Sequence, residues 1–144
     1  MTDQDHRSVT LERLEEGVYL ARNANGAELR FGSKADDAFS PVDLLLAAIA
    51  GCSAVDVDVV TGRRSPALTF SARVDAEKIN DGSGNLLRDI RLTFDVTFPE
   101  GEAGDAARAF LPRAIKQTHE RICTVSRTVE LGTPVAYTVA EPPH

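Results

Sequence analysis

Two stretches of the chain alternate apolar and polar residues over lengths typical of long β-strands. They cover residues 68–77 and 90–98, and a polar loop at residues 80–85 separates them. Their apolar positions are Leu68, Phe70, Ala72, Val74 and Ala76 in the first stretch, and Ile90, Leu92, Phe94, Val96 and Phe98 in the second. The pattern predicts a long antiparallel hairpin with one buried face, which needs another element to cover it.

Shorter apolar segments in the N-terminal third predict three more strands, at residues 8–14, 18–22 and 28–32. The Asn25-Gly26 pair between the last two is the strongest short-range hairpin signal. We therefore expect a small antiparallel meander at this end. The whole chain, residues 1–144, has the length of one domain, and residues 1–7 and 141–144 are expected to be loose tails.

A long helix is predicted between the meander and the hairpin, over residues 40–62. Ser40 suits the N-cap, Pro41 the first helical position, and Asp43 adds negative charge to the first turn. At 1.5 Å per residue the helix would be roughly 30 Å long. Because its middle is apolar or small on every face, we expect it to be buried on all sides, partly against a second copy of the chain.

The C-terminal third returns to helical periodicity over residues 105–122, and Pro112 predicts a kink or break there. A new helical turn is expected at residues 123–130, and a last strand at residues 133–140. The resulting order of elements predicts an α+β fold with antiparallel sheets and with the helices on one side.

Composition narrows the classes of partner. The chain has 144 residues, a net charge of −6 and 42% apolar residues, so nucleic acid and anionic membranes are not expected partners. The N-terminus lacks the basic and apolar pattern of a signal peptide, and the apolar run at residues 44–55 is too short to span a bilayer. These features predict a cytoplasmic protein.

The candidate chemistry lies in the two cysteines, Cys52 and Cys123. In a reducing compartment such residues are more often free, catalytic or redox-sensing than a permanent disulfide. Neither lies in a Cys-x-x-Cys motif or a Cys/His cluster with metal-ligand spacing, so neither a metal nor another cofactor is expected.

Cys52 lies among leucines and alanines, where burial raises the pKa of a thiol, and Asp56 one turn later would raise it further. Taken alone, Cys52 reads as a small buried apolar residue. Asp56 would need a partner if buried, and Arg63, Arg64 and Arg121 are candidates.

Cys123 has a more favourable surrounding for a thiolate, because it opens a helical turn where backbone amides can donate to it. Arg121 and Arg127 are close in sequence. His119 precedes it by four residues and could share its face. The alternative is a buried cysteine at a helix junction with His119 as an ordinary surface residue.

Two segments that carry these cysteines resemble the OsmC/Ohr family of osmotically inducible and organic-hydroperoxide-resistance proteins. They are SPVDLLLAAIAGCSAVD at residues 40–56 and HERICTVS at residues 119–126. The resemblance extends over the element order of the whole chain. It implies an OsmC-like fold, an intertwined homodimer and a site at the dimer interface that holds paired cysteines.

The resemblance also implies a mechanism, and this sequence differs from the peroxidase members at two positions that the mechanism uses. In the peroxidase members a Glu and an Arg activate the first cysteine. The position of the Glu is Val42 here, and Asp43 follows about 100° further round the helix. The turn that carries the Arg reads Glu-Glu-Gly at residues 15–17, which leaves Arg22 or Arg30 as candidates.

Two functions follow as hypotheses. The first is an oxidative-stress protein that reduces organic hydroperoxides: Cys52 attacks the peroxide, Cys123 closes a disulfide, and an external dithiol restores both. Its supporting residues would be Asp43, Asp56, His119 and Arg121. The second is a non-catalytic dimeric OsmC-fold protein that binds a small apolar or electrophilic ligand and uses its cysteines for packing or redox sensing.

Overall fold

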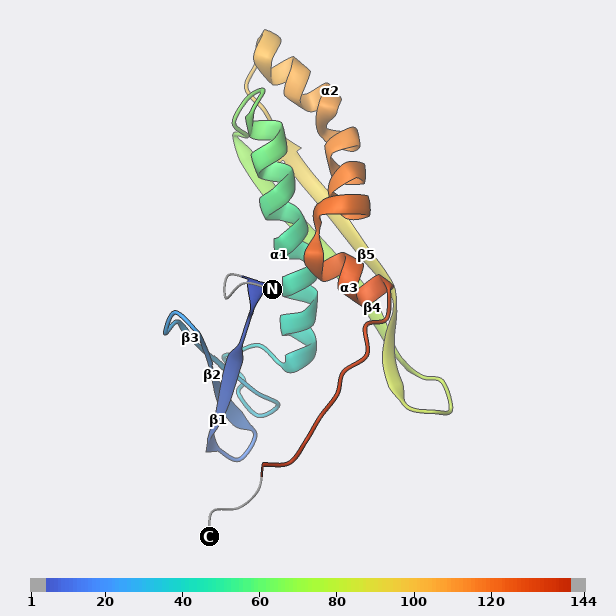
Figure 1. The fold of residues 1–144 in the computed structure, drawn as a ribbon. Helices are drawn as coiled ribbons and strands as arrows, with labels where there is room; N and C mark the ends of the chain where they lie inside the picture. The colour runs from blue at the N-terminus through green and yellow to red at the C-terminus, as the bar shows by residue number, and fades with distance from the viewer. Residues whose placement is uncertain (1–4, 141–144) are drawn as a thin grey trace. The chain divides into compact units, whose positions relative to one another are not determined.

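The computed structural model describes residues 5–140, so the tail predictions for residues 1–4 and 141–144 lie outside the described residues. Contacts divide the chain into two compact units, residues 1–48 and residues 49–144. The helix α1 (Pro41–Gly62) begins in the first unit and continues into the second (Figure 1).

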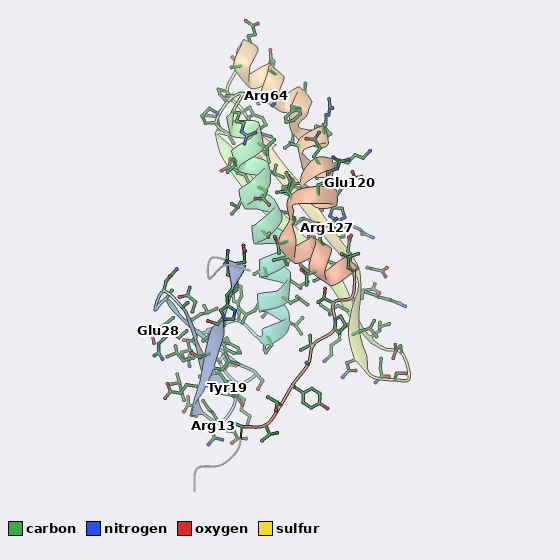
Figure 2. All side chains as sticks on the ribbon, viewed as in Figure 1. Arg13, Tyr19, Glu28, Arg64, Glu120 and Arg127 are labelled. Carbon is green, nitrogen blue, oxygen red and sulfur yellow. The ribbon has the colours of Figure 1, made fainter. Side chains whose placement is uncertain are left out.

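The first unit contains the predicted meander. Its strands are β1 (Val9–Glu15), β2 (Val18–Asn23) and β3 (Glu28–Phe31), which pair antiparallel in the order β1-β2-β3. Gly17 joins β1 to β2 with φ = 76°, a left-handed conformation that glycine adopts without steric cost. Tyr19 of β2 stacks on Phe31 of β3, with ring centroids 5.9 Å apart (Figure 2).

The start of α1 is fixed by a capping box. The Asp43 N–H donates to Ser40 Oγ at 3.2 Å, and the Ser40 N–H donates to Asp43 Oδ2 at 3.0 Å. This reciprocal pair satisfies amide donors that the first turn leaves without helical partners. The residues at positions 40–43 that predicted the start of the helix thus form its N-terminal cap.

The second unit is built on the hairpin of β4 (Thr69–Asn80) and β5 (Asn85–Thr97). Phe70 pairs with Val96 and Val74 with Leu92, so these apolar side chains share one face. They are half-buried, whereas the alternating Ser71 is exposed. The hairpin prediction is confirmed, although the strands extend several residues further toward the turn than predicted.

Three helical segments follow the hairpin: α2 (Glu102–Gln117), η2 (Thr118–Ile122), which is a π-helical turn, and α3 (Thr124–Glu130). In Figure 1, α2 lies beside the part of α1 that belongs to the second unit. Arg64, just after α1, stacks its guanidinium 3.5 Å from the ring centroid of Phe110 on α2 (Figure 2). A cation–π contact thus joins the two helices near the end of α1.

The expectation that α1 is buried on all sides is wrong for the single chain. Only a stripe at four-residue spacing is buried: Ile49, Ser53, Val57 and Thr61. On the other faces, Val55 is 64% exposed and Val59 57%. The bilayer argument also needs correction, because α1 is long and apolar enough to cross a membrane by length and composition, a test that core helices of soluble proteins pass too.

Pro112 predicted a kink or a break, and the break is wrong, since α2 continues through this residue. Ala107 and Ala114 are fully buried on either side of it, so packing holds both halves in place although Pro112 removes one helical hydrogen bond. The regular helix ends instead at the π-helical turn, which begins at Thr118.

The predicted last strand at residues 133–140 is also wrong for the single chain. These residues pair with no strand among the described residues, and Pro134 can donate no ladder hydrogen bond. Val135 is 88% exposed, Tyr137 95% and Val139 88%. The alternation is present, but no described strand pairs with it.

Candidate functional site

The two cysteines meet in the second unit although α2 and the hairpin separate them in sequence. Cys52 lies on α1 and is half-buried; Cys123 lies between η2 and α3 and is fully buried. Both are free thiols, and they are close enough for each to shift the pKa of the other. The fold thus forms a dithiol from two separate motifs.

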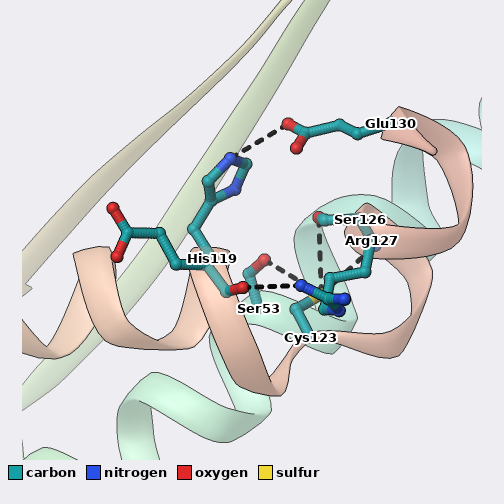
Figure 3. A network of polar contacts seen from close by, with 7 residues as sticks. Ser53, His119, Cys123, Ser126, Arg127 and Glu130 are labelled. Atoms are coloured by element: carbon teal, nitrogen blue, oxygen red, sulfur yellow. Dashed lines mark hydrogen bonds and ion pairs between the residues drawn. The ribbon is translucent and has the colours of Figure 1, made fainter.

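The chain around Cys123 is shaped by the π-helical turn. The Cys123 N–H donates to the Thr118 carbonyl at 2.8 Å, which closes η2. Cys123 then leaves the helical conformation, with ψ = 103°, and becomes the N-cap of α3. Arg127 of α3 donates from Nη1 to the Glu120 carbonyl at 2.8 Å and so ties α3 back to η2 (Figure 3).

The Cys123 sulfur is surrounded by neutral hydrogen-bonding groups. Ser53 Oγ, from α1, donates to Sγ at 3.4 Å, and the Ser126 N–H donates to it at 3.5 Å. The Cys123 S–H itself donates to Ser126 Oγ at 3.4 Å. When the thiol loses its proton, rotation of the Ser126 hydroxyl turns that oxygen into a further donor.

These surroundings shift the two pKa values in opposite directions. Burial alone would raise the pKa of the Cys123 thiol. Hydrogen-bond donors outweigh burial and lower that pKa: the Ser126 hydroxyl, Ser53, the Ser126 N–H and the Cys52 thiol. Burial raises the pKa of the Cys52 thiol, and the neighbouring Cys123 and Asp56 add to the effect; the Val125 N–H offsets only part of it. Cys123 is therefore the thiol that ionises first.

A cavity of about 330 Å³ lies beside the dithiol. Most of its lining is apolar: Ile49, Ile90, Leu92, Phe94, Ile115 and Val129. Its polar lining comprises Ser53, Ser126, Arg91, His119 and Glu130. Ser53 and Ser126 are also the two residues whose hydroxyls contact the Cys123 sulfur, so they separate that sulfur from the cavity.

Of the predicted supporting residues, His119 and Asp56 lie near the dithiol. His119 lines the cavity, and its Nε2 lies 2.9 Å from Glu130 Oε1 (Figure 3). Asp56 is half-buried and acts on the Cys52 pKa, but within the described part of the chain it forms none of the expected ion pairs with arginine.

The other two predicted supporting residues are Arg121 and Asp43. Arg121 is exposed and lines a separate surface depression with Arg113 and Lys116. Asp43 belongs to the capping box described above.

The arginine candidates of the first unit are engaged at its surface. Arg22 pairs with Glu28 at 2.5 Å, and Arg30 pairs with Asp37 at 2.7 Å. In the second unit, over the described residues 49–140, no guanidinium is hydrogen-bonded to either sulfur. Within these described residues of the second unit, both thiols thus lack a direct arginine partner.

Sequence reasoning missed the two serines, and it named Arg127 only as a charge near Cys123, without its bond to the Glu120 carbonyl. Ser126 could have been found, because it lies three residues after an N-cap, where the backbone N–H faces the capping side chain. Ser53 gave no such signal, since its contact with Cys123 joins residues 70 positions apart. Among the described residues there is no group of three or more His, Cys, Asp or Glu that could hold a metal ion.

Comparison with known proteins identifies the family. The family model described as OsmC-like protein matches residues 33–138, and the chain belongs to this family. Protein YhfA of Escherichia coli strain K12 is 28% identical over 115 residues, which cover 78% of this chain and 81% of that protein. The resemblance drawn from the two cysteine segments is thus confirmed.

Solved structures agree at the level of the fold. An OsmC-like protein from Mycoplasma pneumoniae matches with a TM-score of 0.71 at 16% identity, over 90% of this chain and 89% of that one. An organic hydroperoxide resistance protein OsmC from Legionella pneumophila matches with a TM-score of 0.55 at 13% identity, over 89% of this chain and 91% of that one. These structures show that the chain has the OsmC fold, with mixed helices and antiparallel sheets.

Proposed function

We propose that this protein is a thiol-dependent organic hydroperoxide reductase in which Cys52 and Cys123 form the redox pair. The observation that carries the proposal is the pair of neighbouring free thiols, one with a lowered pKa, beside an apolar cavity. A thiolate is the nucleophilic form of cysteine, and a second thiol within reach resolves the sulfenic acid before it is oxidised further. The hydroperoxide-resistance name of the Legionella relative is consistent with this reaction.

The cavity favours a substrate with an apolar body. Its volume is about 330 Å³, and six of its lining side chains are aliphatic or aromatic. Burial of a hydrocarbon group there contributes binding free energy of about 25 cal/mol per Å² of apolar surface. Hydrogen peroxide has no such group, so we expect the enzyme to prefer organic hydroperoxides.

The reaction consumes one equivalent of a dithiol. A cysteine thiolate attacks the terminal oxygen of ROOH, the O–O bond breaks, and ROH leaves. The sulfenic acid then reacts with the other thiol, which forms the disulfide and releases water. An external dithiol reductant returns both cysteines to the thiol state by exchange.

The proposed functional unit is a homodimer. One chain alone leaves apolar surface uncovered in two places. The first is the exposed face of α1, which includes Val55 and Val59, and the second is formed by the exposed apolar residues of the C-terminal segment. A second copy would cover such surface. Light scattering with size exclusion tests this: a dimer mass is expected, and a monomer at micromolar concentration would contradict it.

The enzymatic test is dithiol-dependent consumption of cumene hydroperoxide. The wild type is expected to turn over many equivalents and to form the Cys52–Cys123 disulfide when the dithiol is withheld. The matched control is the double variant Cys52→Ser/Cys123→Ser, which keeps the volume of both side chains nearly unchanged. If the control consumes peroxide as fast as the wild type, the proposal is wrong.

A second candidate function is a non-catalytic binding protein that uses the same cavity. It is favoured by the raised pKa of Cys52 and by Val42, which replaces the family glutamate. Binding of cumyl alcohol, which lacks the reactive O–O bond, measured together with an absence of peroxide consumption would support this alternative.

A further inference from the structure

We infer that the redox state of the Cys52–Cys123 pair controls how firmly α3 is held in place, and through α3 the affinity of the cavity for its ligand. The inference rests on one part of the proposed function, the formation of a disulfide between these two cysteines. The cavity binds its ligand more tightly while the pair is reduced, and α3 loosens when the disulfide forms.

The helix α3 has few buried groups of its own to hold it. It has seven residues, and an isolated helix shorter than about 12 residues is marginal in water. Of these seven residues, all of which the structure describes, only Ser126 is buried. The position of α3 therefore depends on the contacts of Ser126 and on polar contacts at the surface.

Both polar groups of Ser126 are bonded to the Cys123 sulfur. The Ser126 N–H donates to Sγ at 3.5 Å, and the Cys123 S–H donates to the Ser126 hydroxyl at 3.4 Å (Figure 3). Ser53 of α1 donates to the same sulfur at 3.4 Å, so this sulfur joins α3 to α1. Burial raises the pKa of the Cys52 thiol, and the Val125 N–H in the first turn of α3 offsets part of that rise. The first turn of α3 thus lies against both cysteines.

Two further contacts tie α3 to η2 at the protein surface. Arg127 Nη1 donates to the Glu120 carbonyl at 2.8 Å, and Glu130 Oε1 lies 2.9 Å from His119 Nε2. These side chains are exposed, and polar contacts in such places contribute little to stability. The buried contacts of α3 are therefore the ones that depend on the redox state of the pair.

Disulfide formation removes these buried contacts. One hydroperoxide and two thiols give one disulfide, one alcohol and one water, so both sulfur atoms lose their hydrogen. The Cys123 sulfur can then no longer donate to Ser126, and it moves to about 2.05 Å from the Cys52 sulfur. Buried polar groups of Ser126 that lose their partner destabilise the docked position of α3, because in water the same groups would be hydrogen-bonded.

The cavity is lined in part by α3. Ser126, Val129 and Glu130 all contribute to its lining. When α3 is displaced in some of the molecules, the apparent affinity for a ligand falls with the fraction that keeps the complete lining. The linkage is reciprocal, so a bound ligand shifts the thiol–disulfide equilibrium toward the dithiol by the same factor. During turnover, weaker binding after oxidation favours release of the alcohol product before the reductant restores the pair.

The first test compares ligand binding by the two redox forms. The disulfide form is made with diamide, which takes two electrons and two protons from a dithiol and contains no peroxide, and mass spectrometry confirms the Cys52–Cys123 bond. Isothermal titration calorimetry then measures the affinity for cumyl alcohol. We expect it to be at least about fivefold weaker for the disulfide form than for the reduced form. Equal or tighter binding by the disulfide form, no binding by the reduced form, or no disulfide with diamide overturns the inference.

The second test measures backbone hydrogen exchange in the same two forms. A peptide that covers residues 124–131 should exchange at least about fivefold faster in the disulfide form, because α3 opens more often. A peptide that covers residues 105–115 of α2 is the internal control and should exchange at the same rate in both forms. If α3 is equally protected in both forms, the inference is wrong.

The matched control variant is Cys123→Ser. Serine is a good N-cap residue, and this variant cannot form the disulfide. Diamide should change neither its α3 exchange nor its affinity for cumyl alcohol, and a response as large as that of the wild type would show that the disulfide is not the cause.

These measurements separate the inference from the proposed function, since diamide forms the disulfide without peroxide. If the wild type consumes no peroxide while the disulfide loosens α3 and weakens binding, the reductase function is wrong and the inference holds. Consumption of peroxide together with equal affinities of the two forms has the opposite meaning.

Discussion

Ser53→Ala tests whether neutral donors hold the thiolate of Cys123. The substitution removes one oxygen atom and the hydrogen bond that runs from the Ser53 hydroxyl on α1 to the Cys123 sulfur. Ser53 is 3% exposed and lines the cavity, so a water that replaces the lost donor has to come from the cavity side. The backbone of α1 should be unaffected, because alanine is the best helix former.

The size of the effect follows from the geometry. Hydrogen bonds to charged groups contribute about 1.5–3 kcal/mol, and the 3.4 Å separation from sulfur together with the remaining Ser126 donors places this one at the lower end. A loss of about 1.4 kcal/mol corresponds to about one pKa unit. We therefore expect the Cys123 pKa to rise by about one unit in Ser53→Ala.

The assay is the pH dependence of thiolate formation, followed by the rate at which iodoacetamide alkylates Cys123. In a Cys52→Ser background only one of the paired thiols titrates, so the midpoint belongs to Cys123. The alkylation rate at pH values below the midpoint should fall about tenfold, because the thiolate fraction falls by that factor, and the alkaline plateau should not change. The exposed variant Ser71→Ala, on β4, is the matched control.

The same shift predicts a pH-dependent stability difference. A thiol whose folded-state pKa is lowered stabilises the fold above its unfolded pKa, near 8.5, and this contribution is lost as the pH falls through the folded-state pKa. Ser53→Ala should therefore be destabilised by about 1.4 kcal/mol more at alkaline than at acidic pH. A midpoint that stays in place while the alkaline plateau drops would refute the reasoning, since Ser53 would then act on the substrate.

Three further outcomes follow from the structure. Arg127→Ala removes the tie to the Glu120 carbonyl; we expect at least about a tenfold loss of peroxidase rate, with a small change in melting temperature by calorimetry. Val57→Ala removes two buried methyl groups from a residue with 0% exposure and should lower the free energy of unfolding, measured with urea, by about 2 kcal/mol. Its control is Val55→Ala, at a 64% exposed position, which should change the free energy of unfolding by less than about 0.5 kcal/mol. Phe94→Ala enlarges the cavity lining and should raise KM for cumene hydroperoxide more than for the smaller tert-butyl hydroperoxide.

Local sequence patterns were sufficient to predict most of the helices and strands. Period-2 alternation identified the hairpin because one face of β4 and β5 packs and the other meets solvent, and the Ser40–Asp43 capping box marked the start of α1. Both signals act between residues that are neighbours in sequence or across a turn. The tertiary burial of α1 could not be predicted in this way, because an all-apolar helix does not reveal which stripe will meet the rest of its unit.

Errors arose where tertiary packing overrode a local rule. Pro112 predicted a break, yet Ala107 and Ala114 hold α2 together on both sides, and the irregular turn occurs at Thr118, where the sequence has neither proline nor glycine. Residues 133–140 have the alternation of a strand, but an alternating segment forms a strand only where another edge supplies the hydrogen bonds. A pattern in one chain cannot show whether that edge exists.

The candidate site illustrates why the chemistry was harder to predict than the motifs. The two cysteines could be paired through the family resemblance, but the relative acidity of the thiols depends on Ser53, which reaches Cys123 across 70 positions in sequence. A guanidinium would also stabilise a thiolate, at the cost of burying a second charge beside a fully buried sulfur. Hydroxyl and amide donors avoid that desolvation cost, and because they are packed in place before the proton leaves, little reorganisation accompanies ionisation. Neutral donors can therefore lower the pKa of a buried thiol without a guanidinium, and here they act on the thiol they contact, which is Cys123.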